Sequence, residues 1–297
     1  MIKYYFILAF SLLFLNLAAQ PAASVQQLKE QIVAALNNQH GDFAVAFKDL
    51  RSGKTIFINE HSVFHAASTM KTPVLVEAYR QASKGVFSLS DSVLIKNEFK
   101  SIADSSSFSL NVADDSETEL YKHIGEKTLL SSLIYQMIIN SSNLATNIVI
   151  EKLGAKNVTA TMRALGAKDL QVLRGVEDGK AYEKGMNNVV TAFDLALLFE
   201  KMAKGKTVDT RSSEAMIKIL LDQHFNDIIP AKLPPGTKVA HKTGWFTGVH
   251  HDSGIVFLPN GNMYVLVLLS KNLQDEKAAT EAMANVSKMI YDYLVSK

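Results

Sequence analysis

A serine and a lysine stand three residues apart at the start of an apolar segment. Residues 68–71 read Ser-Thr-Met-Lys, and residues 73–76 continue as Pro-Val-Leu-Val. In a helix, three residues are close to one turn, so Ser68 and Lys71 would share a face. A hydroxyl needs a neighbouring base to act as a nucleophile, and a lysine whose pKa is lowered by burial can be that base. A capping serine followed by a solvated lysine is the structural alternative.

Two later segments concentrate polar groups within apolar sequence. Ser141, Ser142 and Asn143 interrupt an otherwise helical apolar pattern in residues 137–147, and residues 239–245 read Val-Ala-His-Lys-Thr-Gly-Trp. Taken singly, each has an ordinary structural explanation. The serines and the asparagine could cap helices, the lysine could be a strand-edge charge, and the glycine could mark a bend.

Taken in order, the three motifs resemble those of the class A serine β-lactamases and related penicillin-binding enzymes. The family patterns are Ser-x-x-Lys, Ser-Asp-Asn and Lys-Thr-Gly. The resemblance covers nearly all of the chain after its N-terminal segment. The first gap, from Ser68 to Ser141, is longer than is usual in the family, which indicates an insertion within residues 97–122. The second gap, to Lys242, is close to the usual spacing.

The resemblance implies a role for each acylating residue. Ser68 would attack the β-lactam carbonyl from a helix N-terminus, where the helix dipole favours negative charge. Lys71 would be the acylation base or a proton relay. Ser141 would pass a proton to the departing nitrogen. Asn143 would hydrogen-bond both Lys71 and the substrate's side-chain amide.

The third motif would bind the substrate along a strand. Lys242 and Thr243 would hold a substrate carboxylate with a cation and a hydroxyl, and Gly244 would leave room for the ligand. Backbone N–H groups of Ser68 and Trp245 would form the oxyanion hole.

Three departures from the family pattern concern deacylation. Ser142 stands where class A enzymes carry aspartate. The family's Arg-x-Glu loop is matched only one residue out of register, by residues 174–177 (Arg-Gly-Val-Glu), and Asn188 replaces the aspartate that would pair with the arginine. Glu177 is nevertheless expected to activate the hydrolytic water, and Glu183 is a poorer candidate.

A fourth departure concerns carboxylate binding. The family often places an arginine on the strand after Lys-Thr-Gly, but no arginine follows Arg211 in this chain, and Ser253 occupies that neighbourhood. Carboxylate binding is therefore expected to rest on Lys242, Thr243 and Thr247.

Length and composition agree with one large soluble domain. The resemblance implies a small β-lactam substrate, and nothing in the sequence demands more than a monomer. The 297 residues are 47% hydrophobic and 20% charged with a formal charge of +2, and no basic stripe indicates nucleic acid. The chain has no cysteine. Residues 250–252, His-His-Asp, are expected to be structural, because adjacent histidines on a strand point to opposite faces. No metal and no other cofactor is expected.

Residues 1–19 have the features of a cleavable secretory signal. Lys3 precedes an apolar run over residues 6–17, and small residues end the segment before Gln20-Pro21. An uncleaved anchor is the alternative. No cysteine follows the apolar run, which argues against a lipoprotein anchor. The expected catalytic domain is 20–297, exported to the periplasm or secreted.

Hydrophobic periodicity predicts an α/β (α+β) fold. Both termini are expected to build one antiparallel sheet flanked by terminal helices, with an all-helical lobe, roughly 69–211, inserted between them. The resemblance, rather than the periodicity, implies that the three motifs converge in an active site at the seam between sheet and lobe. Helices are predicted at 24–37, 127–139, 143–153, 158–165, 191–203 and 276–295, and strands at 43–47, 55–58, 238–242, 253–258 and 263–270.

Three functions are compatible with these observations. The first is a secreted serine β-lactamase, which would degrade β-lactam antibiotics and confer resistance. The second is a penicillin-binding D,D-peptidase-like hydrolase that is acylated but deacylates slowly. The third, a non-catalytic binding protein, is disfavoured because Ser68, Lys71, Ser141 and Lys242 are all present.

Overall fold

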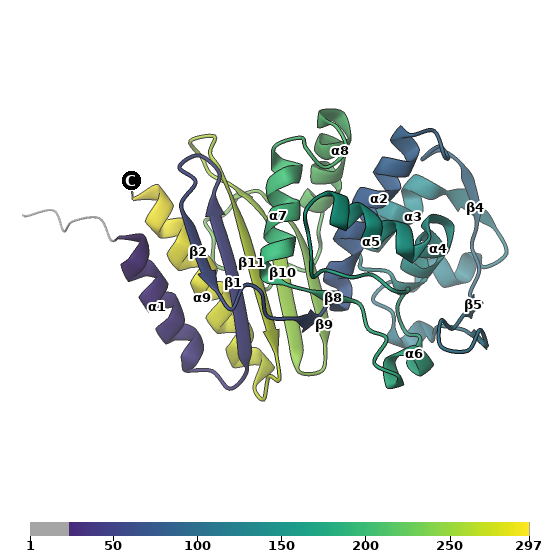
Figure 1. The fold of residues 1–297 in the computed structure, drawn as a ribbon, viewed down its shortest axis with the longest axis horizontal. Helices are drawn as coiled ribbons and strands as arrows, with labels where there is room; N and C mark the ends of the chain where they lie inside the picture. The colour runs from purple at the N-terminus through teal and green to yellow at the C-terminus, as the bar shows by residue number, and fades with distance from the viewer. Residues whose placement is uncertain (1–23, 297) are drawn as a thin grey trace, which may run out of the picture.

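The central element of the molecule is a five-stranded antiparallel sheet (Figure 1). The computed structural model describes residues 24–296, so the expected signal segment lies outside the described residues. The strand order is β2-β1-β11-β10-β9, which confirms the predicted sheet built from both termini. The strands are β1 (Asp42–Asp49), β2 (Thr55–Ile58), β9 (Val239–Phe246), β10 (Val249–Phe257) and β11 (Met263–Lys271).

Both faces of this sheet are buried. Along β11, Tyr264, Leu266 and Leu268 join one hydrophobic core, whereas the intervening residues join a second core on the opposite face. Helices α1 (Val25–Asn37) and α9 (Glu276–Val295) cover the first face, and α7 (Ala192–Ala203) covers the other (Figure 1). Burial on both sides explains why β11 is a nearly continuous apolar run rather than an alternating one.

The remaining helices form a lobe beside the sheet, on the side of α7 (Figure 1). Its core contains α2 (Lys71–Ser83), α3 (Leu130–Ile139), α4 (Asn143–Leu153) and α5 (Ala155–Ala164). Short strand pairs and helices line its edge: β3 (Phe64–His65) with β8 (Val189–Val190), β4 (Ser92–Leu94) with β7 (Lys127–Leu129), β5 (Phe99–Lys100) with β6 (Ser107–Phe108), and α6 (Gly179–Glu183).

Several predicted elements differ from the observed ones. The predicted helix over 127–139 begins only at Leu130, because residues 127–129 pair with β4. Strand β9 was predicted to end at residue 242 but extends to Phe246. Strand β10 was predicted to begin at residue 253 but begins at Val249. Polar residues of the third motif therefore lie within buried strands. Helix α8 (Thr210–Leu221), capped by Asp209, was not predicted.

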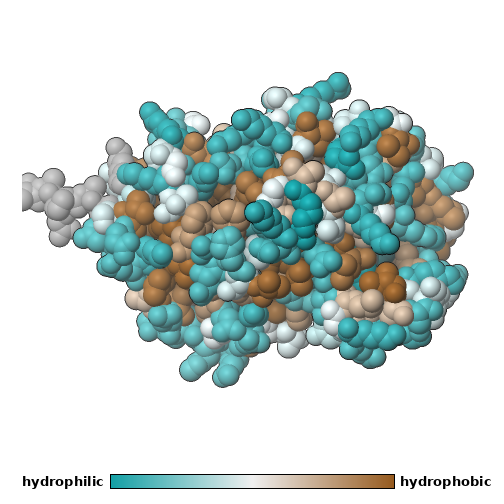
Figure 2. All heavy atoms as spheres, viewed as in Figure 1, coloured by the Kyte–Doolittle hydropathy of each residue, from teal (hydrophilic) through white to brown (hydrophobic). Residues whose placement is uncertain are grey.

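One face of the molecule is shown with its residues coloured by hydropathy in Figure 2. Hydrophilic residues cover most of the face in Figure 2, and hydrophobic residues lie among them in small groups. Within residues 24–296, no helix combines the length and apolar character that a membrane span needs.

Candidate active site

The three sequence motifs meet in one cleft at the seam between sheet and helical lobe. The cleft has a volume of about 520 Å³. Ser68, Ser141, Asn143, Thr243, Gly244 and Trp245 all line it. Seven further lining residues were not predicted to belong to the site, namely Ala113, Asp114, Asp115, Ser116, Phe225, Asp227 and His250.

Ser68 lies in a 3-10 turn, residues 67–70, that leads directly into α2. Ala67 before it has a φ of 44°, a left-handed conformation that is costly for a non-glycine residue, and the Ala67 N–H donates to His65 Nδ1 at 3.1 Å. Strand β9 passes close to this turn. A Cβ atom at Gly244 would lie 3.0 Å from the backbone nitrogens of Ser68 and Thr69. The glycine is therefore what allows the strand to approach the Ser68 backbone.

Two fully buried lysines converge on a single hydroxyl. Lys71 Nζ donates to Ser141 Oγ at 3.1 Å, to the Ser141 carbonyl at 2.6 Å and to Asn143 Oδ1 at 2.9 Å. Lys242 Nζ donates to the same Ser141 Oγ at 3.0 Å and to the Thr243 carbonyl at 2.9 Å. The hydroxyl of Ser141 is thus placed to pass protons between the two amines.

Burial makes both lysines weaker bases than usual. It lowers the pKa of Lys71 to about 7, although Asp115 and Glu177 act in the opposite direction. Burial, followed by the charge of Lys71, also holds the pKa of Lys242 well below its ordinary value. Hence a neutral amine is available in the cleft near neutral pH. Within the described chain, the hydrogen bonds of Lys71 Nζ go to Ser141 and Asn143 and not to Ser68.

The start of helix α4 is held by two side chains. Ser142 caps it by accepting from the Ala145 N–H at 3.2 Å. Asp115, from the segment where the insertion was expected, accepts from the N–H groups of Asn143 and Leu144. Ser141, just before the helix, has a φ of 56°. The cap and Asp115 together stabilise this left-handed residue and so fix the Ser141 hydroxyl between the lysines.

Glu177 lies within the same polar cluster, one amide group away from Lys71. Asn143 Nδ2 donates to Glu177 Oε1, while Asn143 Oδ1 accepts from Lys71. Glu177 has a φ of 59°, so the backbone turns locally at this position. Burial raises the pKa of Glu177, and Asp115 and Asp114 act in the same direction, whereas Asn143 and Lys71 lower it. Glu183, by contrast, is an exposed residue of α6.

The loop that carries Glu177 is closed by neutral amides. Asn188 Oδ1 accepts from the backbone N–H groups of Leu173 and Arg174, and its Nδ2 donates to the Arg174 carbonyl. Asn147 binds both the N–H and the carbonyl of Val176. The Arg174 guanidinium donates to Met186 and Asn187 and makes no ion pair within the described chain. Amide hydrogen bonds therefore close this loop, in place of the Arg–Asp ion pair that the resemblance implied.

The two other candidates for carboxylate binding lie outside the cleft. Ser253 is buried, and its hydroxyl donates to the Lys242 carbonyl on the paired strand. Thr247 is exposed between β9 and β10 and does not line the cleft. Of the four residues considered for carboxylate binding, only Thr243 lines the cleft. Lys242 is buried behind it and donates to the Thr243 carbonyl.

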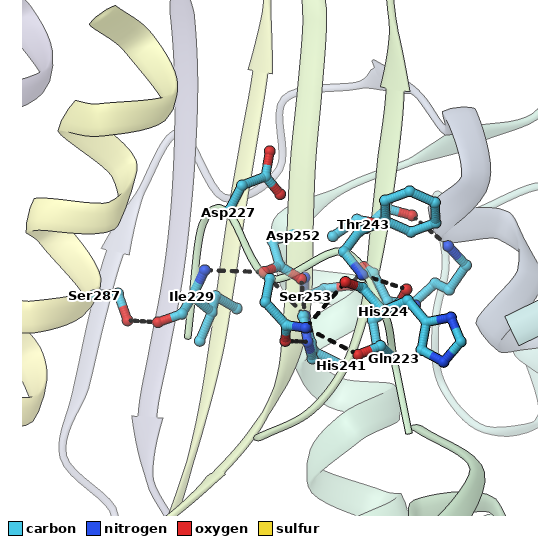
Figure 3. A network of polar contacts seen from close by, with 12 residues as sticks. Gln223, His224, Asp227, Ile229, His241, Thr243, Asp252, Ser253 and Ser287 are labelled. Atoms are coloured by element: carbon cyan, nitrogen blue, oxygen red, sulfur yellow. Dashed lines mark hydrogen bonds and ion pairs between the residues drawn. The ribbon is translucent and has the colours of Figure 1, made fainter. Parts of the chain in front are cut away.

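A buried polar network supports the strand that carries Lys242 (Figure 3). His241 Nδ1 lies 2.9 Å from Asp252 Oδ1, and its Nε2 lies 3.2 Å from Asn226 Oδ1. Asp252 also accepts from the Ile229 N–H, and the Ile229 carbonyl accepts from Ser287 of α9. The network therefore joins β9, β10, α9 and the loop of residues 222–238.

The two adjacent histidines point to opposite faces of β10, as predicted. His250 contacts Thr280 of α9. His251 Nε2 donates to the His65 carbonyl, while the Ser270 N–H donates to its Nδ1. Burial lowers the pKa of His251 to about 4, in keeping with this neutral form. Within residues 24–296, no group of three His, Asp or Glu side chains is arranged to hold a metal ion.

Comparison with known proteins identifies relatives along almost the whole chain. Residues 27–294 match the model of the beta-lactamase enzyme family. The chain is 21% identical to beta-lactamase PSE-4 of Pseudomonas aeruginosa over 299 residues, which cover 98% of this chain and 99% of the relative.

Two solved structures share the fold over most of their length. A beta-lactamase of Sphaerobacter thermophilus aligns with a TM-score of 0.77 and 25% identity, covering 90% of this chain and 97% of the other. The protein PBP-A aligns with a TM-score of 0.80 and 26% identity, covering 93% and 99%. A second PBP-A structure, of a mutant, is an acyl-enzyme complex with penicillin G.

Proposed function

The chain belongs to the beta-lactamase enzyme family as a class A-like member, and from this premise we propose that it hydrolyses the β-lactam amide through an acyl-enzyme on Ser68. The observation that carries the proposal is the placement of two buried lysines on the hydroxyl of Ser141, in the cleft that contains Ser68.

Acylation would begin with transfer of the Ser68 hydroxyl proton to the neutral amine of Lys71. Because Lys71 Nζ donates to Ser141 and Asn143, it must shift towards Ser68 or act through a water, and catalytic hydrogen bonds often tighten only in the substrate complex. Ser68 Oγ then bonds to the β-lactam carbonyl carbon. Backbone N–H groups of Ser68 and Trp245 would stabilise the oxyanion.

The carbon–nitrogen bond would break as Ser141 Oγ gives its proton to the departing nitrogen. Lys71 and Lys242, both hydrogen-bonded to that oxygen, can return a proton to it. Asn143 would hold the substrate's side-chain amide. Thr243, supported by Lys242, would bind its carboxylate, and Gly244 would leave space beside β9.

Deacylation would use Glu177 as general base. Its carboxylate is bonded to Asn143 in the electrostatic field of Lys71, and burial raises its pKa, which makes it a stronger base. A water between Glu177 and the ester carbon would lose a proton to Glu177 and attack the ester. The ester bond to Ser68 Oγ would then break, with a proton returned to that oxygen.

The proposal includes the setting of the enzyme. We place the mature catalytic domain at 20–297, with the helical lobe at roughly 69–211, as a monomer exported to the periplasm or secreted. Its substrates would be β-lactam antibiotics, against which it would confer resistance.

A chromogenic cephalosporin tests the proposed activity directly. Purified protein should convert many equivalents, and Ser68→Ala should abolish turnover and the penicilloyl adduct seen by intact-mass spectrometry. Release of one equivalent followed by a long-lived adduct would instead identify the penicillin-binding, D,D-peptidase-like alternative. An adduct that persists in Ser68→Ala would exclude Ser68 as the nucleophile.

A further inference from the structure

The end of the cleft beyond Thr243 contains a histidine and a carboxylate that the mechanism above does not use. His250 Nε2 lies 3.3 Å from Asp227 Oδ2, and both residues line the cleft together with Ser68 and Thr243. The side chain of His250 is 11% exposed and that of Asp227 is 54% exposed. Asp227 can therefore turn away into solvent, whereas the imidazole is held in place.

The orientation of the imidazole is fixed by helix α9. Thr280 Oγ1 donates its only proton to the Glu276 carbonyl at 2.7 Å, so it accepts from His250 Nδ1, 2.8 Å away. The Nδ1 atom is therefore the protonated one, and Nε2 faces Asp227 and the cleft. Protonation at Nε2 makes the ring a cation whose free N–H points at an anion.

The loop that carries the partner carboxylate is anchored on either side of Asp227, although the carboxylate itself is exposed. Asp227 lies on the loop between α8 and β9, one residue from Asn226, which binds His241, and two from Ile229, which binds Asp252 (Figure 3). At the other side of the loop, Gln223 donates to the Ile138 carbonyl of α3. The loop is thus attached to both walls of the cleft.

Charge balance indicates what this pair binds. No arginine follows Arg211 in the chain, and Lys242 Nζ is fully buried and bonded to Ser141 and Thr243. His250 is then the nitrogen-bearing side chain that β10 presents to the cleft beside Thr243, since β10 within the described chain has no lysine or arginine.

We propose that His250 is a specificity-determining residue that binds the carboxylate of the substrate, and that Asp227 occupies the imidazole in the free enzyme as an internal competitor. This inference rests on the proposed function. It places the substrate carboxylate between Thr243 and His250, both of which line the cleft. Binding exchanges one carboxylate partner of the imidazole for another.

The test compares a penicillin with its methyl ester, which lacks the charge. The second-order rate constant of acylation is followed by intact-mass spectrometry, which works whether or not the acyl-enzyme is hydrolysed. His250→Gln should lower the constant for the acid about tenfold, the usual worth of a hydrogen bond to a charged group, and that for the ester less than about twofold. His250→Arg should restore the acid preference.

Asp227→Asn should raise the constant for the acid several-fold, because the competitor has lost its charge, and the gain should vanish in the His250→Gln background. Asp222→Asn, on the same loop but bonded to Tyr135 outside the cleft, is the matched control for removal of one negative charge. Circular dichroism verifies that each variant folds.

Equal losses for acid and ester in His250→Gln, or an Asp227→Asn gain that survives without His250, would overturn the inference. These results leave the proposed function intact as long as wild-type protein is acylated. Wild-type protein that forms no adduct with either compound would instead contradict the proposed function itself.

Discussion

At the scale of single residues, Ser141 couples the two lysines of the cleft. One hydroxyl accepts from both Lys71 and Lys242, so the protonation of either amine is felt by the other. Burial lowers the pKa of each amine, and the charge of Lys71 lowers that of Lys242 further. The site therefore contains an amine that can act as a base near neutral pH.

Acylation should depend on pH through Lys71. The amine is charged below its pKa of about 7 and neutral above it, so the acylation rate constant should rise with pH and level off above about 7. Since Glu177 raises the pKa of Lys71, Glu177→Gln should move this rise to lower pH. Stopped-flow acylation between pH 5 and 9, in both proteins, measures the two midpoints. Profiles that are identical or shifted to higher pH would rule out the coupling.

Glu177→Gln also tests the deacylation base. Acylation should persist, but hydrolysis of the acyl-enzyme should slow on the order of 10²- to 10⁴-fold, the usual worth of a positioned general base. The variant should show a stoichiometric burst and accumulate adduct. Glu183→Gln, which changes an exposed carboxylate of α6, is the control. Unchanged steady-state turnover in Glu177→Gln would show that another group activates the water.

The residues that could be predicted are those that belong to a local motif. Ser68, Ser141 and Lys242 were identified because each lies in a short pattern whose spacing carries chemical meaning. Asp115 and Asp227 line the same cleft but belong to no such pattern, and His250 lies in the His-His-Asp segment that was expected to be structural. They come from residues 97–122, where an insertion was expected, from a loop and from a strand, and their proximity arises only in the folded chain.

At the scale of elements, the shape of the cleft depends on how closely β9 packs against the turn that carries Ser68. We expect Gly244→Ala to reduce acylation about a hundredfold, because the added Cβ would push β9 from Ser68 and a shift of about 1 Å has this cost. Gly179→Ala, where a Cβ meets nothing within 4 Å, is the control. Acylation at the wild-type rate in Gly244→Ala would contradict this prediction, because it would show that β9 can move away from Ser68 without loss of activity.

Element boundaries were predictable where caps and periodicity agree. Helices α4 and α9 have the predicted ends, and each begins next to a side-chain cap, at Ser142 and Asp275. Strands β9 and β10 were predicted too short. Strand β9 continues beyond residue 242 through Thr243, and β10 begins before residue 253 with His250, His251 and Asp252, all of which are polar yet buried. The three β10 side chains can be buried because they are hydrogen-bonded in the folded protein. Hydrophobic periodicity in a single sequence gives no information about such tertiary hydrogen bonds.

At the scale of the whole molecule, His251 makes stability depend on pH. It joins the sheet to the segment before Ser68 in its neutral form, with a pKa of about 4 against 6.5 ordinarily. Above pH 6.5 it is neutral whether folded or unfolded. As pH falls from 6.5 to 4, the unfolded chain takes up the proton first, so the free energy of unfolding should fall, by on the order of 3 kcal/mol for this group.

Urea unfolding at pH 7 and pH 4.5 measures this dependence. His65, whose pKa is also lowered to about 4 by burial and by Arg174, acts in the same direction, so His251→Gln should flatten the pH dependence without removing it. His40→Gln controls for the loss of an exposed histidine. The assignment would be wrong if His251→Gln kept the full wild-type slope.

The fold class could be predicted because its signals are global. Apolar strands near both ends and helices in the middle suffice to indicate one sheet with an inserted lobe. The short pairs β4 with β7 and β5 with β6 could not be predicted, since strands of two or three residues leave no measurable period.

The pairing of β1 with β11 also constrains how the chain acquires its structure. Asp42 lies opposite Lys271 and Asp49 opposite Tyr264, so the central strands come from opposite ends of the polypeptide. Such non-local pairing carries a large loop-closure entropy and slows folding. During synthesis, β1 and β2 must wait for nearly the entire chain before their partner exists. A nascent molecule therefore lacks its central sheet until translation is almost complete, which leaves a long interval in which chaperones can bind it unfolded.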